Sequence, residues 1–497
     1  MALSAENSPL LRGSGRHLSQ KNNQIQVSNV IWGIVGLVVG VLAMGLRSYR
    51  LEMDLHIAHY PHSKYSKVQG IGFQIYTGGA PAKLPDGRKN PECIGRNSYG
   101  HMDDGGDDGP ILQCYVGHED PMEDVRQRLE LMREAVDRAH ELADPDPSTL
   151  KVFIAPEFFW RGVNGAYSFA YDENGNSFNE CGAICEILKG LEEIVAQQKL
   201  EDWLFVMGTV VASEALPTED PYDFLFYNFA PLYKGYDPDK MDHSGKRFLV
   251  PKRYVSSSDF LTPRRFLNET AVRELIDEAL PDHDTTVFNP FDFSIKRYDN
   301  DMWSKYKNEL NNIGYTMIEY DWLMVDGISF TCEICFDHDR RSAKNTYLAD
   351  IVTGRTTRIP SSSDKGLTFV PIPAYQAQIS LVSSAGMTVT EDSLALTNMG
   401  VIFLQDGLNN SSNRMYWGAM EGCEYTKGFQ FDGGTEAVRR EAILTKDDVF
   451  FEYRSVQSFQ RYLVYDEWEK RLKGSFSSKA YPPELVIYAS MDVAQVM

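Results

Sequence analysis

The chain has 497 residues, of which 43% are hydrophobic and 12% aromatic, so most of it can build a packed core. Its net charge of −21 argues against a nucleic-acid partner, because phosphate binding needs clustered lysine and arginine side chains. Seven cysteines are too few for the disulfide framework of a protein of this size, and the odd number leaves at least one thiol free.

The first clear element is an apolar run near the amino terminus. No charged residue occurs over 22–46, and 30–46 is almost wholly aliphatic or small. A helix of about 20 residues crosses the hydrocarbon core of a bilayer. We therefore predict a transmembrane signal-anchor helix at 29–46, a cytoplasmic tail at 1–28 and a stalk at 47–66. A cleaved signal peptide is the alternative, but its charged region normally lies nearer the start of the chain.

Charges and short motifs indicate the orientation of this predicted helix. Three basic residues precede it and two follow it closely, which favours a cytoplasmic amino terminus. The segment 6–11 resembles the acidic dileucine signal that cytosolic adaptors read for lysosomes and vacuoles. Potential glycosylation sites at Asn268, Asn409 and Asn410 fit a lumenal domain. We expect a single-pass membrane glycoprotein whose large domain faces the lumen of a vacuole, lysosome or other endomembrane compartment.

The remaining elements alternate between strands and helices. Residues 79–113 are rich in Gly, Pro and Asp and are typical of a loop insertion. Strand patterns occur at 67–76, 150–155, 203–211, 224–233, 248–254, 324–332 and 377–383, and helical patterns at 122–142 and 179–200. This alternation predicts an α/β layered domain over 67–475, with insertions near 79–113 and 262–320, followed by a C-terminal tail at 476–497.

Three of the predicted strands end near a residue that can take part in chemistry. Glu157 lies among Phe and Trp, so its pKa should rise and it could accept a proton near neutral pH. Lys252 could stabilise a developing oxyanion. Cys335 follows an apolar strand at a turn, a position that presents a thiol as a nucleophile. Taken singly, each has an ordinary alternative: a glutamate in water, an edge-strand lysine and a buried small residue.

The order of these three residues resembles that of the nitrilase, or carbon–nitrogen hydrolase, superfamily. Similar segments occur within roughly 67–450 at 206–209, 227–228 and 379–387. The resemblance implies a four-layer α-β-β-α sandwich, preceded here by one transmembrane helix. It also implies that Glu157 is the base, that Lys252 stabilises the oxyanion and that Cys335 is the nucleophile. It implies no cofactor or metal ion, and it allows a homo-oligomer, because many relatives assemble.

The residues around the cysteine indicate the branch of this superfamily. Cys335 is preferred to Cys332 as the nucleophile, because Cys335-Phe336-Asp337 matches the Cys-aromatic-Asp pattern of the family. Phe336 and Asp337 resemble the amidase and carbamoyl-hydrolysing branches, whereas the nitrile-cleaving branch tends to have Trp-Glu. We therefore expect hydrolysis of a small linear amide through a cysteine thioester.

One part of the family site has no single candidate here. Family members often use a second glutamate between the lysine and the cysteine. Glu269, Glu274, Glu309 and Glu319 are candidates in this interval, which is longer than usual and carries the second expected insertion. The sequence does not choose among them.

Two other classes of function stay open. A protein of this kind can keep a fold and bind a ligand without catalysis. Cys332 and Cys335 could instead form a redox or metal pair, although zinc would need a second ligand pair and the sequence has no second C-x-x-C. A thioredoxin-like pair would begin a helix, whereas Cys332 is expected within a strand.

Overall fold

The described part of the chain begins near the end of the predicted stalk, at residue 63. The computed structural model describes residues 63–78, 80–81, 98–101, 111–114, 117–118, 120–162, 165–169, 182–215, 224–240, 245–254, 262–263, 300–318, 320–346, 358–363, 366–371, 377–390, 393–408, 435–444, 449–456, 458–464 and 483–494. All of these belong to one unit, His62–Met497. The predicted tail at 1–28, the predicted membrane helix at 29–46 and the three potential glycosylation sites lie outside the described residues.

The first sheet is mixed and contains eleven strands. They are β1 (Lys67–Gln74), β5 (Thr149–Ala155), β6 (Tyr167–Ser168), β7 (Trp203–Met207), β8 (Val210–Ala215), β9 (Phe224–Lys234), β10 (Arg247–Pro251), β12 (Tyr315–Met317), β21 (Phe459–Leu463), β22 (Glu484–Tyr488) and β23 (Met491–Asp492). The main order is β12-β10-β9-β7-β5-β1-β22-β21. β22, from the segment expected as a C-terminal tail, pairs with β1 in the interior of this sheet.

The second sheet has the order β16-β15-β13-β14-β17-β18-β19-β20. Its strands are β13 (Trp322–Val325), β14 (Ile328–Ile334), β15 (Arg358–Ser363), β16 (Gly366–Pro371), β17 (Ala377–Ser384), β18 (Leu396–Asp406), β19 (Thr435–Leu444) and β20 (Val449–Ser455). β14, β17 and β18 are parallel, so their carboxyl ends meet at one edge of the sheet. A small third sheet joins β2 (Ala80–Pro81), β3 (Ser98–His101), β4 (Ile111–Cys114) and β11 (Thr262–Pro263) from the two expected insertions.

The helices described over their whole length are α2 (Pro121–Leu142), α3 (Ala183–Val195), η3 (Gln198–Leu200), α5 (Asn300–Asn312) and α6 (Phe336–Asp339). α2 confirms the helix predicted at 122–142. Asp120 caps its first turn by accepting the Glu123 N–H over 2.9 Å, and proline occupies its first helical position. α3 begins later than the helical pattern predicted, after Gly182.

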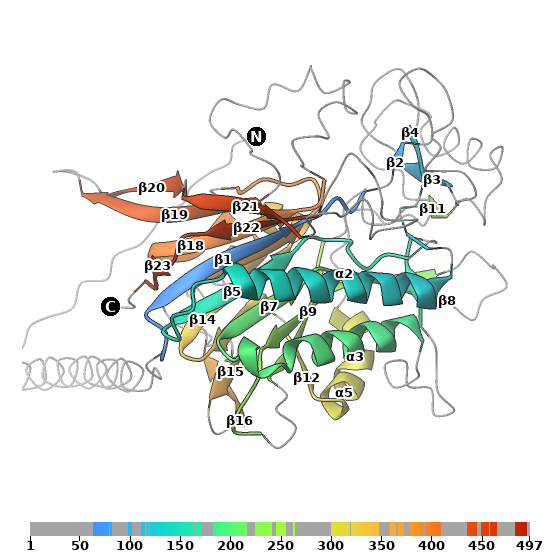
Figure 1. Ribbon diagram of the computed structural model, residues 1–497, viewed down its shortest axis with the longest axis horizontal. Helices are drawn as coiled ribbons and strands as arrows, with labels where there is room; N and C mark the ends of the chain where they lie inside the picture. The colour runs from blue at the N-terminus through green and yellow to red at the C-terminus, as the bar shows by residue number, and fades with distance from the viewer. Residues whose placement is uncertain are drawn as a thin grey trace, which may run out of the picture. The chain divides into compact units, whose positions relative to one another are not determined.

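Two hydrophobic clusters lie on opposite faces of the first sheet. Alternate side chains of β5 divide between them: Phe153 joins the helix-side cluster with residues of α2, α3 and α5, whereas Val152 and Ile154 join the inter-sheet cluster with residues of β14, β17 and β18. Figure 1 shows α2 and α3 side by side across the strands of the first sheet. The described layers are therefore helix, sheet and sheet.

The expected four-layer α-β-β-α sandwich preceded by a transmembrane helix is wrong. The described chain is a mixed α/β structure in which strands predominate, and its long helices pack in the helix-side cluster rather than as a second layer over the other sheet. The sequence pattern assigned one strand to the region after residue 355, whereas the structure places most of the second sheet there. Within the described residues, no helix combines the length and apolarity needed to cross a bilayer.

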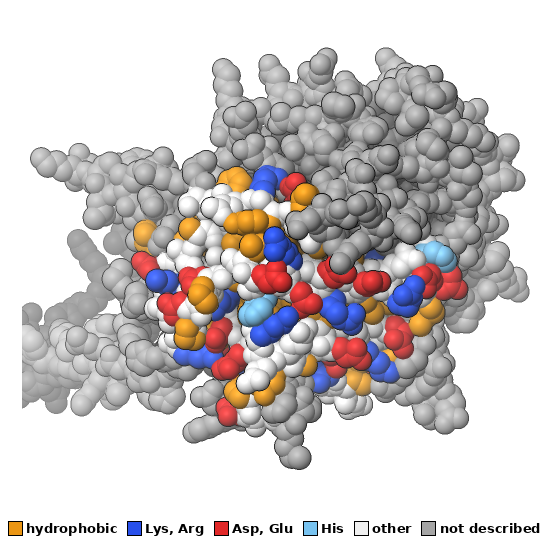
Figure 2. Space-filling view, viewed as in Figure 1, with side chains coloured by type: hydrophobic (Ala, Val, Ile, Leu, Met, Phe, Trp, Pro, Cys, Tyr) orange, Lys and Arg blue, Asp and Glu red, His pale blue; other side chains and the backbone are white. Residues whose placement is uncertain are grey.

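The helix-bearing face carries interspersed charges. Acidic and basic side chains alternate over its described part (Figure 2). Several are paired at close range, as in Lys199 Nζ with the Asp137 carboxylate at 2.7 Å and Arg138 with the Glu141 carboxylate at 2.8 Å. Such exposed pairs contribute little to stability, but they keep this face free of a large field of one sign.

Candidate active site

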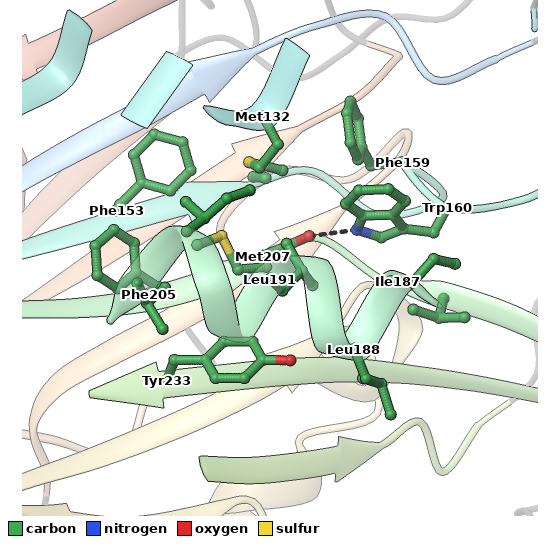
Figure 3. Packing of buried hydrophobic residues seen from close by; sticks show 14 of the residues in the cluster. Met132, Phe153, Phe159, Trp160, Ile187, Leu188, Leu191, Phe205, Met207 and Tyr233 are labelled. Atoms are coloured by element: carbon green, nitrogen blue, oxygen red, sulfur yellow. Dashed lines mark hydrogen bonds between the residues drawn. The ribbon is translucent and has the colours of Figure 1, made fainter. Parts of the chain in front are cut away.

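Glu157 lies on a sharp turn just after β5. The next residue, Phe158, has a positive φ of 64°, which reverses the chain direction. Phe159 and Trp160 then bury their rings in the helix-side cluster, where Trp160 Nε1–H donates to the Met207 carbonyl over 2.8 Å (Figure 3). Two of the three aromatic rings expected around the Glu157 carboxylate thus anchor the turn in the core.

The Glu157 carboxylate instead contacts a cation and an amide. Its Oε1 accepts hydrogen bonds from Lys252 Nζ over 2.8 Å and from Asn228 Nδ2 over 2.9 Å. All three side chains are 0% exposed. The backbone of Lys252 is also bound to Asn228, because the Lys252 N–H donates to the Asn228 carbonyl over 2.8 Å. Desolvating two charges costs several kcal/mol per ion, so this pair depends on its close contact and on the added amide bond.

Cys335 occupies a strained position between β14 and α6. Its φ of 46° and ψ of −107° are rare for a residue with a side chain, and such a conformation costs about 1–3 kcal/mol. The surrounding structure enforces it, because β14 ends at Ile334 and α6 begins at Phe336. The side chain is buried in the inter-sheet cluster. Strained residues of this kind cluster at active sites and ligand-binding positions.

The end of β17 joins the glutamate turn to the cysteine turn. The Cys335 N–H donates to the Ser383 carbonyl over 2.9 Å, and the Glu157 N–H donates to the Ser384 carbonyl over 3.1 Å. Ser383 Oγ also donates to the Ala155 carbonyl over 3.0 Å, which ties β17 to the end of β5. The two predicted site residues are therefore bound through their amides to adjacent residues of one strand.

Asp337 connects the cysteine turn to the lysine. Its two carboxylate oxygens accept the Arg253 N–H, each over 3.0 Å, and one of them accepts the Tyr254 N–H over 2.7 Å. Burial raises the pKa of Asp337 well above its ordinary value, and nearby Asp321 raises it further, whereas Lys252 lowers it. The structure thus brings Glu157 into contact with Lys252 and links both to the Cys335 turn.

The geometry of Cys332 disfavours a redox pair with Cys335. Cys332 is fully buried in β14, and both cysteines are free. Residues three apart in a strand are separated by about 10 Å, beyond the roughly 7 Å limit for a disulfide without backbone movement. Burial also raises the pKa of the Cys332 thiol well above its ordinary value, and the carboxylates of Asp321, Glu333 and Asp337 raise it further. A thiol of this kind is a poor source of thiolate.

The second glutamate of the family pattern is not assigned by the structure. Glu269, Glu274 and Glu319 lie outside the described residues. Glu309 lies on α5, whose Tyr306 and Leu310 pack in the helix-side cluster. Among the described residues, no group of three or more His, Cys, Asp or Glu side chains could hold a metal ion.

Sequence reasoning gave no role to three polar residues that the structure places around the site. Asn228 contacts Glu157, and Glu333 contacts His338 across the turn that holds Cys335. One signal was available in the sequence: Asn228 and Glu333 each lie within a strand that is rich in apolar residues, where an unpaired polar side chain would be costly. Their partners lie on other elements or across a turn, so the pairings themselves required the fold.

The chain matches no known protein-family model, and it matches no curated protein.

Proposed function

We propose that the chain hydrolyses the carbon–nitrogen bond of a small linear amide, with Cys335 as the nucleophile. One arrangement carries the proposal: a strained cysteine whose turn is tied through β17 and Asp337 to a fully buried pair of Glu157 and Lys252. Cys335, Glu157 and Lys252 would each supply a different group that the reaction needs. A thiol needs a base, and the developing oxyanion needs a positive charge.

In the first half of the proposed reaction, Glu157 takes the thiol proton as the Cys335 sulfur bonds to the carbonyl carbon. Lys252, with a backbone amide near Phe336, stabilises the oxyanion of the tetrahedral intermediate. The carbon–nitrogen bond then breaks, and Glu157 passes the proton to the leaving amine. A thioester on Cys335 remains.

In the second half, Glu157 takes a proton from water as the water oxygen bonds to the thioester carbon. The carbon–sulfur bond breaks, the acid leaves, and the proton returns to the Cys335 sulfur. A positioned acid–base group supplies about 10²–10⁴-fold in rate, and one oxyanion donor supplies a similar factor.

The test compares two cysteines of the same strand region. Purified full-length chain is incubated with a panel of linear amides, amine or ammonia release is measured, and Cys335 acylation is followed by peptide mass spectrometry. Cys335→Ala should abolish both signals. Cys332→Ala is the matched control, because it removes another buried thiol three residues earlier, and it should keep both signals.

Three outcomes would overturn the proposal. Hydrolysis that persists in Cys335→Ala removes the nucleophile. Normal turnover in Glu157→Gln removes the base. Failure of the wild-type chain to hydrolyse any amide or to acylate Cys335 with a reactive amide analogue, while still binding such ligands, would favour a catalytically silent binding protein.

A further inference from the structure

A buried glutamate and histidine flank the cysteine turn. Glu333 precedes Cys335 by two residues in β14, and His338 follows it in α6. Glu333 Oε2 lies 2.8 Å from His338 Nδ1, and Glu333 Oε1 accepts the Ala343 N–H over 3.0 Å. Both side chains are at most 1% exposed. Glu333 therefore binds two residues that follow Cys335 in the chain, with one carboxylate oxygen for His338 and the other for Ala343.

The second nitrogen of His338 makes a contact that fixes its protonation pattern. His338 Nε2 accepts the Thr390 N–H over 3.1 Å. A nitrogen that accepts a hydrogen bond carries no proton, so the neutral ring carries its proton on Nδ1, where it donates to Glu333. Glu333 and Thr390 thus select the same tautomer from opposite sides of the ring.

Thr390 belongs to a segment, 385–390, that follows the strand end holding the site. Asp406 Oδ2 holds the start of this segment by accepting the Gly386 N–H over 2.6 Å and the Met387 N–H over 2.8 Å. Met387 packs against the inter-sheet cluster that contains Cys335. The bond to His338 holds the far end, so segment 385–390 is fixed to β18 at one end and to the cysteine turn at the other.

We propose that His338, held in its Nδ1–H form by Glu333, is a positioning residue that couples the Cys335 turn to segment 385–390. This assignment rests on the proposed role of Cys335. The coupling sets the separation between the nucleophile and the segment that packs beside it, and so the shape of the site that receives the amide. His338 acts through Cys335 and segment 385–390 and does not exchange a proton with the substrate.

Two amide replacements of His338 separate the two contacts. In His338→Asn the side-chain amide can replace Nδ1–H towards Glu333 but cannot reach Thr390. In His338→Gln the longer side chain places an oxygen near the former Nε2 position, where it can accept the Thr390 N–H. A purely structural role for the imidazole would make the two variants equally defective.

The primary measurement is hydrogen exchange of the Thr390 amide, followed in the full-length chain by peptide mass spectrometry. His338→Asn should raise exchange at Thr390 by about tenfold, the equivalent of one lost hydrogen bond, and slow alkylation of Cys335 by acrylamide. His338→Gln should remain within about threefold of wild type in both. Equal changes in the two variants, or unchanged exchange in His338→Asn, would overturn the proposal.

A measurement on the wild-type chain guards against variants that fail to fold. Nitrogen-15 NMR of histidine-labelled protein distinguishes the two neutral tautomers, and the His338 signal is the one missing from His338→Gln. An Nε2–H tautomer would refute the coupling. If exchange and tautomer agree with expectation while no amide is hydrolysed, the coupling stands and the proposed function fails.

Discussion

The strongest consequence of the site geometry concerns the pair formed by Glu157 and Lys252. Lys252→Met removes the cation from the Glu157 carboxylate, which is 0% exposed. That carboxylate also accepts a hydrogen bond from the Asn228 amide. Breaking a buried ion pair by removing one partner costs about 3–5 kcal/mol. Glu157→Gln should cost a comparable amount, because it removes the carboxylate that lies 2.8 Å from the buried Lys252 ammonium.

The double variant distinguishes a coupled pair from two independent defects. In Glu157→Gln with Lys252→Met neither charge of the pair remains, and the Gln oxygen can still accept the Asn228 amide, so the total loss should fall below the sum of the single losses by at least about 1–3 kcal/mol. Urea unfolding followed by tryptophan fluorescence measures each midpoint. All three variants should lose amide hydrolysis even where stability returns.

An exposed ion pair provides the control for this cycle. Lys199 and Asp137 lie 2.7 Å apart, but their side chains are 35% and 43% exposed. The cycle of Lys199→Met and Asp137→Asn should therefore give a coupling below about 1 kcal/mol. Additive losses at Glu157 and Lys252, no larger than this control, would refute the reasoning that the pair is desolvated and mutually dependent.

Three further predictions concern neighbouring groups. Burial raises the pKa of Asp337 well above 3.8, so the unfolded chain loses this proton at a lower pH than the folded chain does. The free energy of unfolding should therefore fall as the pH rises above about 4. Asp337→Asn should flatten that decline in urea titrations across pH. Burial lowers the pKa of Lys234 from 10.5 to about 8, so between pH 8 and pH 10.5 this side chain is protonated in the unfolded chain and neutral in the folded chain. The free energy of unfolding should therefore rise with pH between these two values. Thermal unfolding of Lys234→Met should show no such rise. Gly208 has a φ of 76°, and an added Cβ would lie 2.8 Å from the Pro156 carbonyl beside Glu157; Gly208→Ala should cost about 1–3 kcal/mol and reduce turnover, and an unchanged urea midpoint would contradict this.

Local signals in the sequence were sufficient for some elements and misleading for others. α2 was predictable because a capping Asp120, a first-turn proline and a helical apolar pattern all agree. The single strand predicted at 324–332 is two strands, β13 and β14, joined by Asp326 and Gly327, whose φ values are 48° and 79°. This Asp-Gly pair is a strong hairpin signal that the apolar run around it concealed.

The three candidate residues each follow the end of a buried strand, a position that a local apolar pattern can indicate. What the sequence could not supply is the set of contacts that joins them. The bond from Asn228 to Glu157 and the bonds from Arg253 and Tyr254 to Asp337 span long stretches of chain, so their existence depends on how strands pair. Local patterns carry no information on such distant pairings.

The strain at Cys335 provides a test of whether this edge is organised for function. At a φ of 46° and ψ of −107°, a Cβ is disfavoured and glycine is not. Cys335→Gly should therefore be more stable than Cys335→Ala by about 1 kcal/mol in urea unfolding. At Cys332, within regular β14, the order should reverse, because glycine weakens a strand interior by about 0.5–1 kcal/mol relative to alanine.

The comparison has a direct bearing on catalysis. If glycine is favoured at Cys335, the thiol is retained at a position where another residue would give a more stable protein. A binding protein without covalent chemistry does not need a strained cysteine at this position, whereas a nucleophile needs its thiol despite the cost in stability. Alanine proving more stable than glycine at position 335 would remove the strain, and with it this argument for an active thiol.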